Sequence, residues 1–385
     1  MRTTSKFALP PWILLGAVLA IGVVVQPAAA DDTDFVQHNL VSNIPGLATY
    51  TDPNLVNPWG ISFNGGSPFW VSDNAAGVVT LYNKQGQPVS LVVNIPSPTG
   101  PTGGTPTGQV ANPNPASSFG GARFIFSTED GLIASWSGGT QAVTQVNNSS
   151  AGAVYKGLAM GTDGSSTYLY AANFNAGTID VYNSSFNKTT LGGSFTDSTL
   201  PTGYAPFNVQ NIGGLLYVTY ALQDSAKHDD VPGAGHGFVD VFTTGGVLVQ
   251  RLVSMGQLNS PWGLAMAPAG FGAFAGDLLV GNFGNGWINA YNPTTGAFVG
   301  TLDGTNGAPI VELGLWDITF DPNGAGAKPD TLYFTAGLPD SSGQLEQNGL
   351  LGALVPTPEP WAWLLFATGL AIFIGYRMPL RKQRF

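Results

Sequence analysis

One phrase of sequence recurs along the chain, and this repetition constrains the fold more than any other feature. It first reads NPWGISFNGGSPFWVSDNAAGVVTLYN, from Asn57 to Asn83, and it returns in altered form at residues 156–183 and 260–292. Each copy contains short runs of β-branched and aromatic residues separated by Gly, Asn, Asp and Pro, which is typical of strands joined by tight turns. The sequence therefore predicts a repeat protein built from small sheets.

The spacing of the repeats predicts an all-β, six-bladed β-propeller. A period of roughly 50 residues with four strands per unit is typical of propeller blades, and closing the ring removes exposed sheet edges. The first strands of the blades are expected to start at Pro58, Pro106, Lys156, Pro206, Pro261 and Leu315. An early strand within residues 35–42 is expected to join the last blade and close the ring. A β-sandwich with accidental similarity is the alternative, but Trp59 and Trp262 share an identical Pro-Trp-Gly context.

Composition agrees with this fold and excludes several functions. Only 9% of the residues are charged, whereas long amphipathic helices need more charge, and there are 53 glycines, 28 prolines and no cysteine. Without cysteine, thiol catalysis and Cys-ligated zinc are excluded. Residues 31–360 hold 7 basic and 23 acidic residues, a net charge of −16. A body this acidic repels nucleic acid, which we exclude as a partner.

Residues 1–30 are predicted to be a secretory signal peptide. Arg2 and Lys6 precede an apolar stretch at residues 12–25, and small residues follow up to Ala30. This order of positive, apolar and small-residue regions is typical of a cleaved signal. An uncleaved membrane anchor is the alternative, because residues 7–30 carry no charge.

Residues 356–385 predict a membrane span followed by a basic tail. The segment between Glu359 and Arg377 carries no charge. As a helix it would be about 25 Å long, which is close to the roughly 30 Å hydrocarbon core of a bilayer. The basic residues after it predict a cytoplasmic tail and therefore an exported body.

The motif Pro358-Glu359-Pro360 stands immediately before this span. The order of Pro-Glu-Pro, apolar helix and basic tail resembles the PEP-CTERM sorting signal of exopolysaccharide-producing Gram-negative bacteria. The resemblance implies recognition by an exosortase, transient anchoring in the inner membrane, cleavage near the motif, and release or transfer to the cell surface or matrix. We therefore divide the chain into a signal peptide (1–30), a propeller (31–355) and a sorting segment (356–385).

Candidate site residues lie in the loops that join the second and third strands of the blades. In a propeller these loops share one face, and here they are rich in Asp, Asn and Gly. Closing the ring would gather four of these residues around one channel mouth: Asp73, Glu129, Asn173 and Asn282. Their oxygens could bind Ca²⁺, which accepts 6–8 oxygen ligands, or the hydroxyl groups of a sugar. Turn chemistry is the alternative, because Asn, Asp and Gly tolerate left-handed backbone angles.

The fourth blade carries the most unusual of these loops, LQDSAKHDDVPGAGHG at residues 222–237. His228 beside Asp229 could be an oriented general base, and His228, Asp230 and His236 could bind a metal. No spacing matches a strong catalytic motif. A ligand-binding loop and a merely solvated loop are the other interpretations.

Aromatic residues recur at two repeat positions. Trp59, Trp262 and Trp316 occupy the first, and the second is held by Tyr82, Tyr182 and Tyr291. Aromatic residues at fixed blade positions predict packing between blades, with a sugar-stacking surface as the alternative.

The phrases NPWGISF, FWVSDNAAGVVTLYN, RFIFSTEDGLIASW and KHDDVPGAGHGFVDVF resemble a family of exported NHL-like β-propellers associated with PEP-CTERM systems. The resemblance runs from about Phe35 to Leu354; it implies the fold and export, and it supplies no catalytic residues. We expect a cell-surface or extracellular-matrix protein that binds polysaccharide or surface proteins. The alternative is a calcium-dependent hydrolase or lactonase, since propellers of the gluconolactonase type hold Ca²⁺ in the channel through Glu, Asn and Asp.

Overall fold

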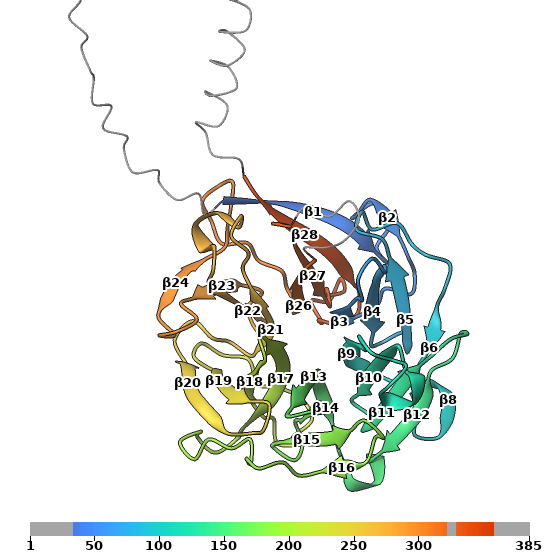
Figure 1. Cartoon of the computed structure of the whole chain (residues 1–385). Coiled ribbons are helices and arrows are strands. Elements are labelled where there is room, and N and C mark those ends of the chain that lie inside the picture. Colours follow the sequence, from blue (N-terminus) through green and yellow to red (C-terminus); the bar gives the residue numbers. More distant parts are fainter. Residues whose placement is uncertain (1–33, 322–328, 358–385) are drawn as a thin grey trace, which may run out of the picture. The chain divides into compact units, whose positions relative to one another are not determined.

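A computed structural model describes residues 34–321 and 329–357 (Figure 1). The predicted signal peptide, the Pro-Glu-Pro motif and the predicted membrane span lie outside these ranges. Within the ranges, no helix has both the length and the apolar character needed to cross a membrane.

The described residues form a six-bladed β-propeller, which confirms the predicted fold class (Figure 1). Each of the first five blades is a four-stranded sheet whose strands follow one another in the chain and pair antiparallel. Blade 1 contains β3 (Pro58–Ser62), β4 (Phe69–Asp73), β5 (Val78–Tyr82) and β6 (Val93–Asn94). Blade 2 contains β9 (Pro106–Ala111), β10 (Phe124–Thr128), β11 (Leu132–Trp136) and β12 (Val143–Asn147).

The next three blades repeat this order. Blade 3 contains β13 (Tyr155–Asp163), β14 (Ser166–Asn173), β15 (Thr178–Asn183) and β16 (Lys188–Thr189). Blade 4 contains β17 (Tyr204–Ile212), β18 (Leu215–Leu222), β19 (Phe238–Thr243) and β20 (Leu248–Ser254). Blade 5 contains β21 (Pro261–Met266), β22 (Leu278–Asn282), β23 (Ile288–Tyr291) and β24 (Phe298–Thr301).

Blade 6 closes the ring with strands from both ends of the described chain. It combines β26 (Leu315–Phe320), β27 (Leu332–Ala336) and β28 (Leu350–Pro356) with the N-terminal strand β1 (Asp34–Ser42). β1 runs antiparallel to β28, from the pair Phe35–Pro356 to the pair Ser42–Leu350. The predicted closing strand is therefore confirmed. The short strands β2 (Tyr50–Thr51) and β25 (Asp303–Gly304) add to β1 in parallel.

The connections contain little further regular structure. β7 (Pro96–Ser97) and β8 (Gly100–Gly103) form a small hairpin in the Gly/Pro-rich loop between blades 1 and 2. Three short 3₁₀ turns occur at η1 (Phe119–Gly121), η2 (Ser149–Ala151) and η3 (Gly272–Phe274).

Each inner strand is bulged near its first residues, where its pairing with the second strand of the blade shifts register. A β-bulge changes the direction in which nearby side chains point. Just inside the start of each inner strand, at equivalent positions of the six repeats, stand Trp59, Thr107, Lys156, Phe207, Trp262 and Trp316. These six residues lie within the bulges, and their side chains therefore determine what occupies the centre of the ring.

Four of these side chains form an aromatic plug, which we define as Trp59, Phe207, Trp262 and Trp316. The rings of Trp59 and Trp316 stack with centroids 3.4 Å apart, and the Trp262 ring meets both edge-on at about 6 Å. All four belong to one buried cluster. The predicted packing of these tryptophans between blades is confirmed, and it also fills the middle of the channel. The repeated tyrosines are buried between blades as well.

The residue after each of these six positions controls how closely neighbouring blades approach. A Cβ atom on Gly108 would lie 2.4 Å from the backbone nitrogen of Leu158 in the next blade. Where the residue is not glycine, its side chain bonds to the next blade instead: Asn208 Nδ2 donates to Trp262 O at 2.9 Å. The inner strands are thus held in direct contact around the axis.

Candidate functional site

Lys156 replaces an aromatic residue at the hub, where blades 1, 5 and 6 have tryptophan. Its side chain is only 2% exposed. The Nζ atom forms an ion pair with Glu129, in the loop between β10 and β11, and another with Asp229 Oδ1 at 3.1 Å, in the long loop of blade 4. One buried ammonium group therefore joins the loops of two different blades.

The protonation of Lys156 follows from these partners. Burial by itself would lower the pKa of the Lys156 ammonium, but the carboxylates of Glu129 and Asp229 outweigh burial and raise this pKa above its usual value. The Nζ atom also lies over the Trp59 ring, 5.2 Å from its centre, so the aromatic plug makes a cation–π contact with this ammonium. Lys156 is accordingly charged at neutral pH.

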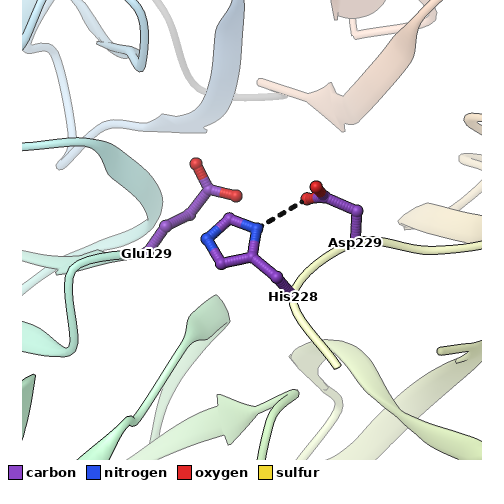
Figure 2. Close-up of side chains that lie close together, drawn as sticks. All are labelled: Glu129, His228 and Asp229. Carbon is purple, nitrogen blue, oxygen red and sulfur yellow. Dashed lines mark hydrogen bonds and ion pairs between the residues drawn. The ribbon is translucent and has the colours of Figure 1, made fainter. Parts of the chain in front are cut away.

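A cluster of polar side chains surrounds this ammonium, and Figure 2 shows the His228 ring between the carboxylates of Glu129 and Asp229. His228 Nδ1 is 2.9 Å from Asp229 Oδ1, and Asn74 Nδ2 donates to Glu129 Oε2 at 2.8 Å. The side chains of Asp229 and His228 are 65% and 47% exposed, whereas Glu129 is 13% exposed. We call Glu129, Lys156, His228 and Asp229 the hub cluster; it has a buried floor and an exposed rim.

Asp224 gives the long loop of blade 4 its shape. Its Oδ1 accepts hydrogen bonds from the backbone N–H groups of His228 at 2.9 Å and Asp229 at 3.3 Å. The backbone N–H of Asp224 in turn donates to Asp229 O at 2.8 Å. An aspartate that bonds to backbone groups a few residues later is a common turn device. It fixes His228 and Asp229 as neighbours over Lys156.

Two further acidic side chains adjoin the hub cluster. Burial raises the pKa of Asp230 to about 6, with Asp229 adding to the shift and Lys156 opposing it. Burial likewise raises the pKa of Glu346, in the loop between β27 and β28, to about 7, and the charges of Glu129 and Asp229 add to this shift. The mouth of the channel therefore gains negative charge as the pH rises through neutrality.

Three of the four residues predicted to form a calcium-binding ring are used differently. Asp73 Oδ2 accepts from Thr80 Oγ1 at 2.6 Å, Asn173 Nδ2 donates to Asp180 Oδ2 at 3.1 Å, and Asn282 Nδ2 donates to Gln257 O at 2.8 Å. All three are buried at the ends of second strands, and these hydrogen bonds hold their side chains within the protein. The predicted ring is therefore corrected, since only Glu129 of the four lies in the hub cluster.

The metal-binding hypothesis for the blade 4 loop also changes. Among the described residues, one group of acidic and histidine side chains is compact enough to hold an ion, with ligand atoms within 4.8 Å of one another: Glu129, His228 and Asp229. Asp230 and His236 are outside it, and His236 Nδ1 lies 2.8 Å from Val231 O in its own loop. The predicted set of His228, Asp230 and His236 is therefore not assembled.

The ammonium of Lys156 already pairs with both carboxylates of this group. Two unit charges of the same sign about 4 Å apart repel by about 4 kcal/mol at an effective dielectric constant of 20, and a divalent ion doubles that figure. A calcium ion between Glu129 and Asp229 would meet this repulsion. The geometry thus favours an internally paired cluster over a cation site.

Sequence reasoning missed Lys156 and Glu346. Lys156 did have a signal, because it is the one charged residue at a repeat position that is otherwise mostly aromatic. Glu346 had none, since its loop shows no repeat pattern.

Comparison with known proteins places the chain in a family. No protein-family model matches it. It is 33% identical over 293 residues to "Uncharacterized protein R648" of Acanthamoeba polyphaga mimivirus, covering 72% of this chain and 71% of that one. It is 31% identical over 346 residues to "Uncharacterized protein L690" of the same virus, covering 82% and 84%. The chain belongs to the family of these mimivirus proteins. The match to L690 includes most of this family member's length, so the likeness extends over most of the propeller.

Solved structures resemble the chain in fold alone. A Bacteroides thetaiotaomicron protein, described as a structural genomics protein of unknown function, superposes with a TM-score of 0.51 at 13% identity, covering 84% of this chain and 76% of that one. A glucose dehydrogenase gives 0.49 at 14% identity, covering 84% and 100%. A streptogramin B lyase gives 0.48 at 13% identity, covering 84% and 99%.

The raised pKa of Glu346 predicts a pH-dependent stability. The folded state keeps the Glu346 proton up to about pH 7, whereas an unfolded glutamate loses it near pH 4.3. The contribution of Glu346 to the free energy of unfolding is therefore fully present below about pH 4.3, and it is lost as the pH rises through about 7. Glutamine does not ionise, so Glu346→Gln should not lose this stability. We expect the unfolding free energy of the variant, minus that of the wild type, to increase by about 1–3 kcal/mol from pH 5 to pH 8, as measured by urea unfolding.

Asp340→Asn, in the same loop, is the matched control. Hydrogen bonds from Ser342 lower the pKa of Asp340, so this group is ionised in the folded and unfolded chain throughout the range. Its effect should not vary with pH. A pH-independent difference between Glu346→Gln and the wild type would contradict the raised pKa.

Proposed function

We propose that this protein is an exported β-propeller that binds polysaccharide through the face carrying the hub cluster, and that it acts as a binding protein and not as an enzyme. The observation that carries the proposal is the pairing of Lys156 with Glu129 and Asp229. The pairing occupies the carboxylate of Glu129 and one carboxylate oxygen of Asp229, Oδ1. The side chains of His228 and Asp229 then form a rim that faces solvent. Polar groups displayed by loops on a rigid scaffold are suited to recognition.

The exposure of His228 favours binding over catalysis. A general base gains much of its power from an enclosed site where water is excluded, and the side chains of His228 and Asp229 are about half exposed or more. Exposed imidazole and carboxylate groups can instead bond to ligand hydroxyl groups directly or through water. The rim therefore suits a ligand that is rich in hydroxyl groups.

Charge narrows the class of polysaccharide. Residues 31–360 carry a net charge of −16, and the mouth itself holds Glu129, Asp229, Asp230 and Glu346 against Lys156. Acidic polysaccharides would be repelled at low ionic strength. We therefore propose a glycan of neutral or amino-bearing sugars.

Export and sorting form the second part of the proposal, and the two chain ends support it. Residues 1–30 have the order of a signal peptide, and residues 356–385 have the order of a PEP-CTERM segment. We propose passage through the inner membrane of a Gram-negative bacterium, transient anchoring by the C-terminal helix, processing by an exosortase, and delivery to the cell surface or matrix.

A calcium-dependent hydrolase or lactonase is the second candidate. The proximity of Glu129, His228 and Asp229 within 4.8 Å is the observation that favours it. The ammonium of Lys156 beside two of these three groups counts against it.

Replacing His228 tests the binding face. We expect the secreted propeller, residues 31–357, to bind neutral or amino-bearing glycans on an array, and His228→Ala to weaken this binding at least tenfold, or about 1.4 kcal/mol. Because His228 is exposed, its loss should change the unfolding free energy by less than about 1 kcal/mol. His38→Ala, an exposed histidine on the outer strand β1, is the matched control and should bind like the wild type.

Two results would contradict the binding proposal. One is unchanged glycan binding by His228→Ala. The other is a rise in melting temperature with millimolar Ca²⁺ that a chelator reverses, accompanied by lactone or ester hydrolysis, which would establish the enzyme instead.

The mass of the mature protein tests sorting. We expect the protein isolated from its native host to lack residues 1–30 and the segment that follows Pro360. Deleting the exosortase should leave the C-terminal segment attached. An intact mass that includes residues 361–385 in the unmodified host would disprove processing.

A further inference from the structure

The channel continues on the other side of the aromatic plug as a second, polar space. The inner strands begin at the hub-cluster face, as the pairing of Pro58 with the last residue of β4 shows, so their later residues lie towards the opposite face. These later residues line a cavity of about 250 Å³. We call it the lower channel cavity; its polar lining includes Ser62, Gln109, Asn208, Gln210, Asp317 and Thr319.

Some of these polar groups hold the blades together. Gln109 Nε2 donates to Trp70 O at 2.8 Å and also to Gly60 O, and its Oε1 accepts from Ser62 Oγ at 3.1 Å. Asn208 Nδ2 donates one hydrogen to Trp262 O, which leaves its second hydrogen available. The wall is therefore rigid and still able to bond to a ligand.

Other groups are free to bind. Within the described part of the chain, the side chains of Gln210 and Thr319 make no hydrogen bond, and both are only partly buried. The Gln210 amide offers two donors and an acceptor, and the Thr319 hydroxyl offers one donor and two acceptor positions. Groups that donate and accept within one small space match the hydroxyl groups of a sugar.

The charge of the lining argues for a neutral ligand. No lysine, arginine or histidine lines the lower channel cavity, so a phosphate, sulfate or carboxylate would find no counter-charge. The one acidic lining residue, Asp317, already accepts the N–H groups of Ile61 at 2.7 Å and Ile318 at 2.9 Å. Burial also raises the pKa of Asp317 to about 7. A cationic ligand would therefore find at most a partly ionised, internally bonded partner.

Size and apolar contacts agree with one sugar ring. An apolar cavity of about 150 Å³ accommodates benzene, so about 250 Å³ has room for a six-membered ring with hydroxyl substituents. Leu158, Met160 and Trp262 add apolar surface to the lining, and such surface can pack against the C–H face of the ring.

We propose that the lower channel cavity binds one neutral monosaccharide unit, either as a free sugar or as the terminal residue of a glycan chain. This site is separate from the hub cluster, because the aromatic plug lies between them. The proposal therefore does not depend on polysaccharide binding at the hub-cluster face.

Replacing Gln210 tests the site in the full mature chain. The probes are glucose, galactose, mannose and N-acetylglucosamine, with glucuronate and glucose 6-phosphate as charged analogues, measured by calorimetry at up to about 20 mM, since weak sites have millimolar Kd. At least one neutral sugar should bind, and Gln210→Ala should raise its Kd at least tenfold. Thr319→Val, which keeps the shape of the side chain, should also weaken binding. Both charged analogues should bind at least tenfold more weakly than the neutral sugar with the lowest Kd.

Gln250→Ala is the matched control. Gln250 lies on the outermost strand of the same blade, β20, so the same chemical change there should leave the Kd within about twofold. Oligosaccharides that carry the preferred sugar at one end distinguish a free sugar from a glycan terminus as the natural ligand. Tighter binding than the free sugar indicates a glycan terminus, whereas equal or weaker binding indicates the free sugar.

Three results would overturn the proposal: no neutral sugar or glycan terminus binds, Gln210→Ala and Thr319→Val bind like the wild type, or the charged analogues bind as well as the preferred neutral sugar. His228→Ala keeps the two proposals distinguishable. It should leave sugar binding in the lower channel cavity unchanged even if glycan binding at the hub-cluster face is lost.

Discussion

The meeting of six inner strands at one axis is the constraint on which the rest of this structure depends. The strands approach so closely that several repeats have glycine directly after the residue at the centre of the ring, while Asn208 and Asp317 use their side chains to bond to the next blade. The residue that precedes this glycine, asparagine or aspartate must then fill the centre of the ring. Four repeats supply an aromatic side chain, which stabilises the hub by burying apolar surface. Blade 3 supplies a lysine, and a buried ammonium must be paired to be tolerated.

That requirement organises the candidate site. Lys156 fixes Glu129 and Asp229 at the hub, and Asp224 fixes His228 beside Asp229, so loops from blades 2 and 4 present one rigid polar rim. The plug divides the channel into two ends of different chemistry. The end at the hub-cluster face is charged and partly exposed. The lower channel cavity is lined by amide and hydroxyl groups together with Asp317, and no basic residue lines it. We propose that both ends bind hydroxyl-rich molecules, through independent sets of residues.

The sequence predicted the architecture well, because a propeller repeats one pattern many times. The closing strand within residues 35–42 and the packing of Trp59 with Trp262 follow from periodicity and are confirmed. Four of the six predicted first-strand starts are also confirmed, whereas blades 3 and 4 begin one and two residues earlier than predicted, at Tyr155 and Tyr204. The site was harder, because Asn and Asp can either face a ligand or bond to their own turn. Asp73 and Asn282 instead bond to neighbouring segments, at Thr80 and Gln257, and nothing in their spacing predicts this outcome. Glu129 and Asp229 meet at Lys156, and this contact depends on side-chain directions that periodicity does not specify.

A double-mutant cycle on Lys156 and Glu129 tests this account most directly. The unfolding free energies of Lys156→Met, Glu129→Gln and the double variant would be measured by urea unfolding at pH 7. If the buried ion pair organises the hub, Lys156→Met should cost about 3–5 kcal/mol, because it leaves the mostly buried Glu129 carboxylate without its cation. Glu129→Gln should cost less, because Asp229 still pairs with Lys156. The double variant should then be more stable than additivity predicts by at least about 1 kcal/mol. Effects that add within about 0.5 kcal/mol would show that Lys156 and Glu129 act independently, and would contradict the account.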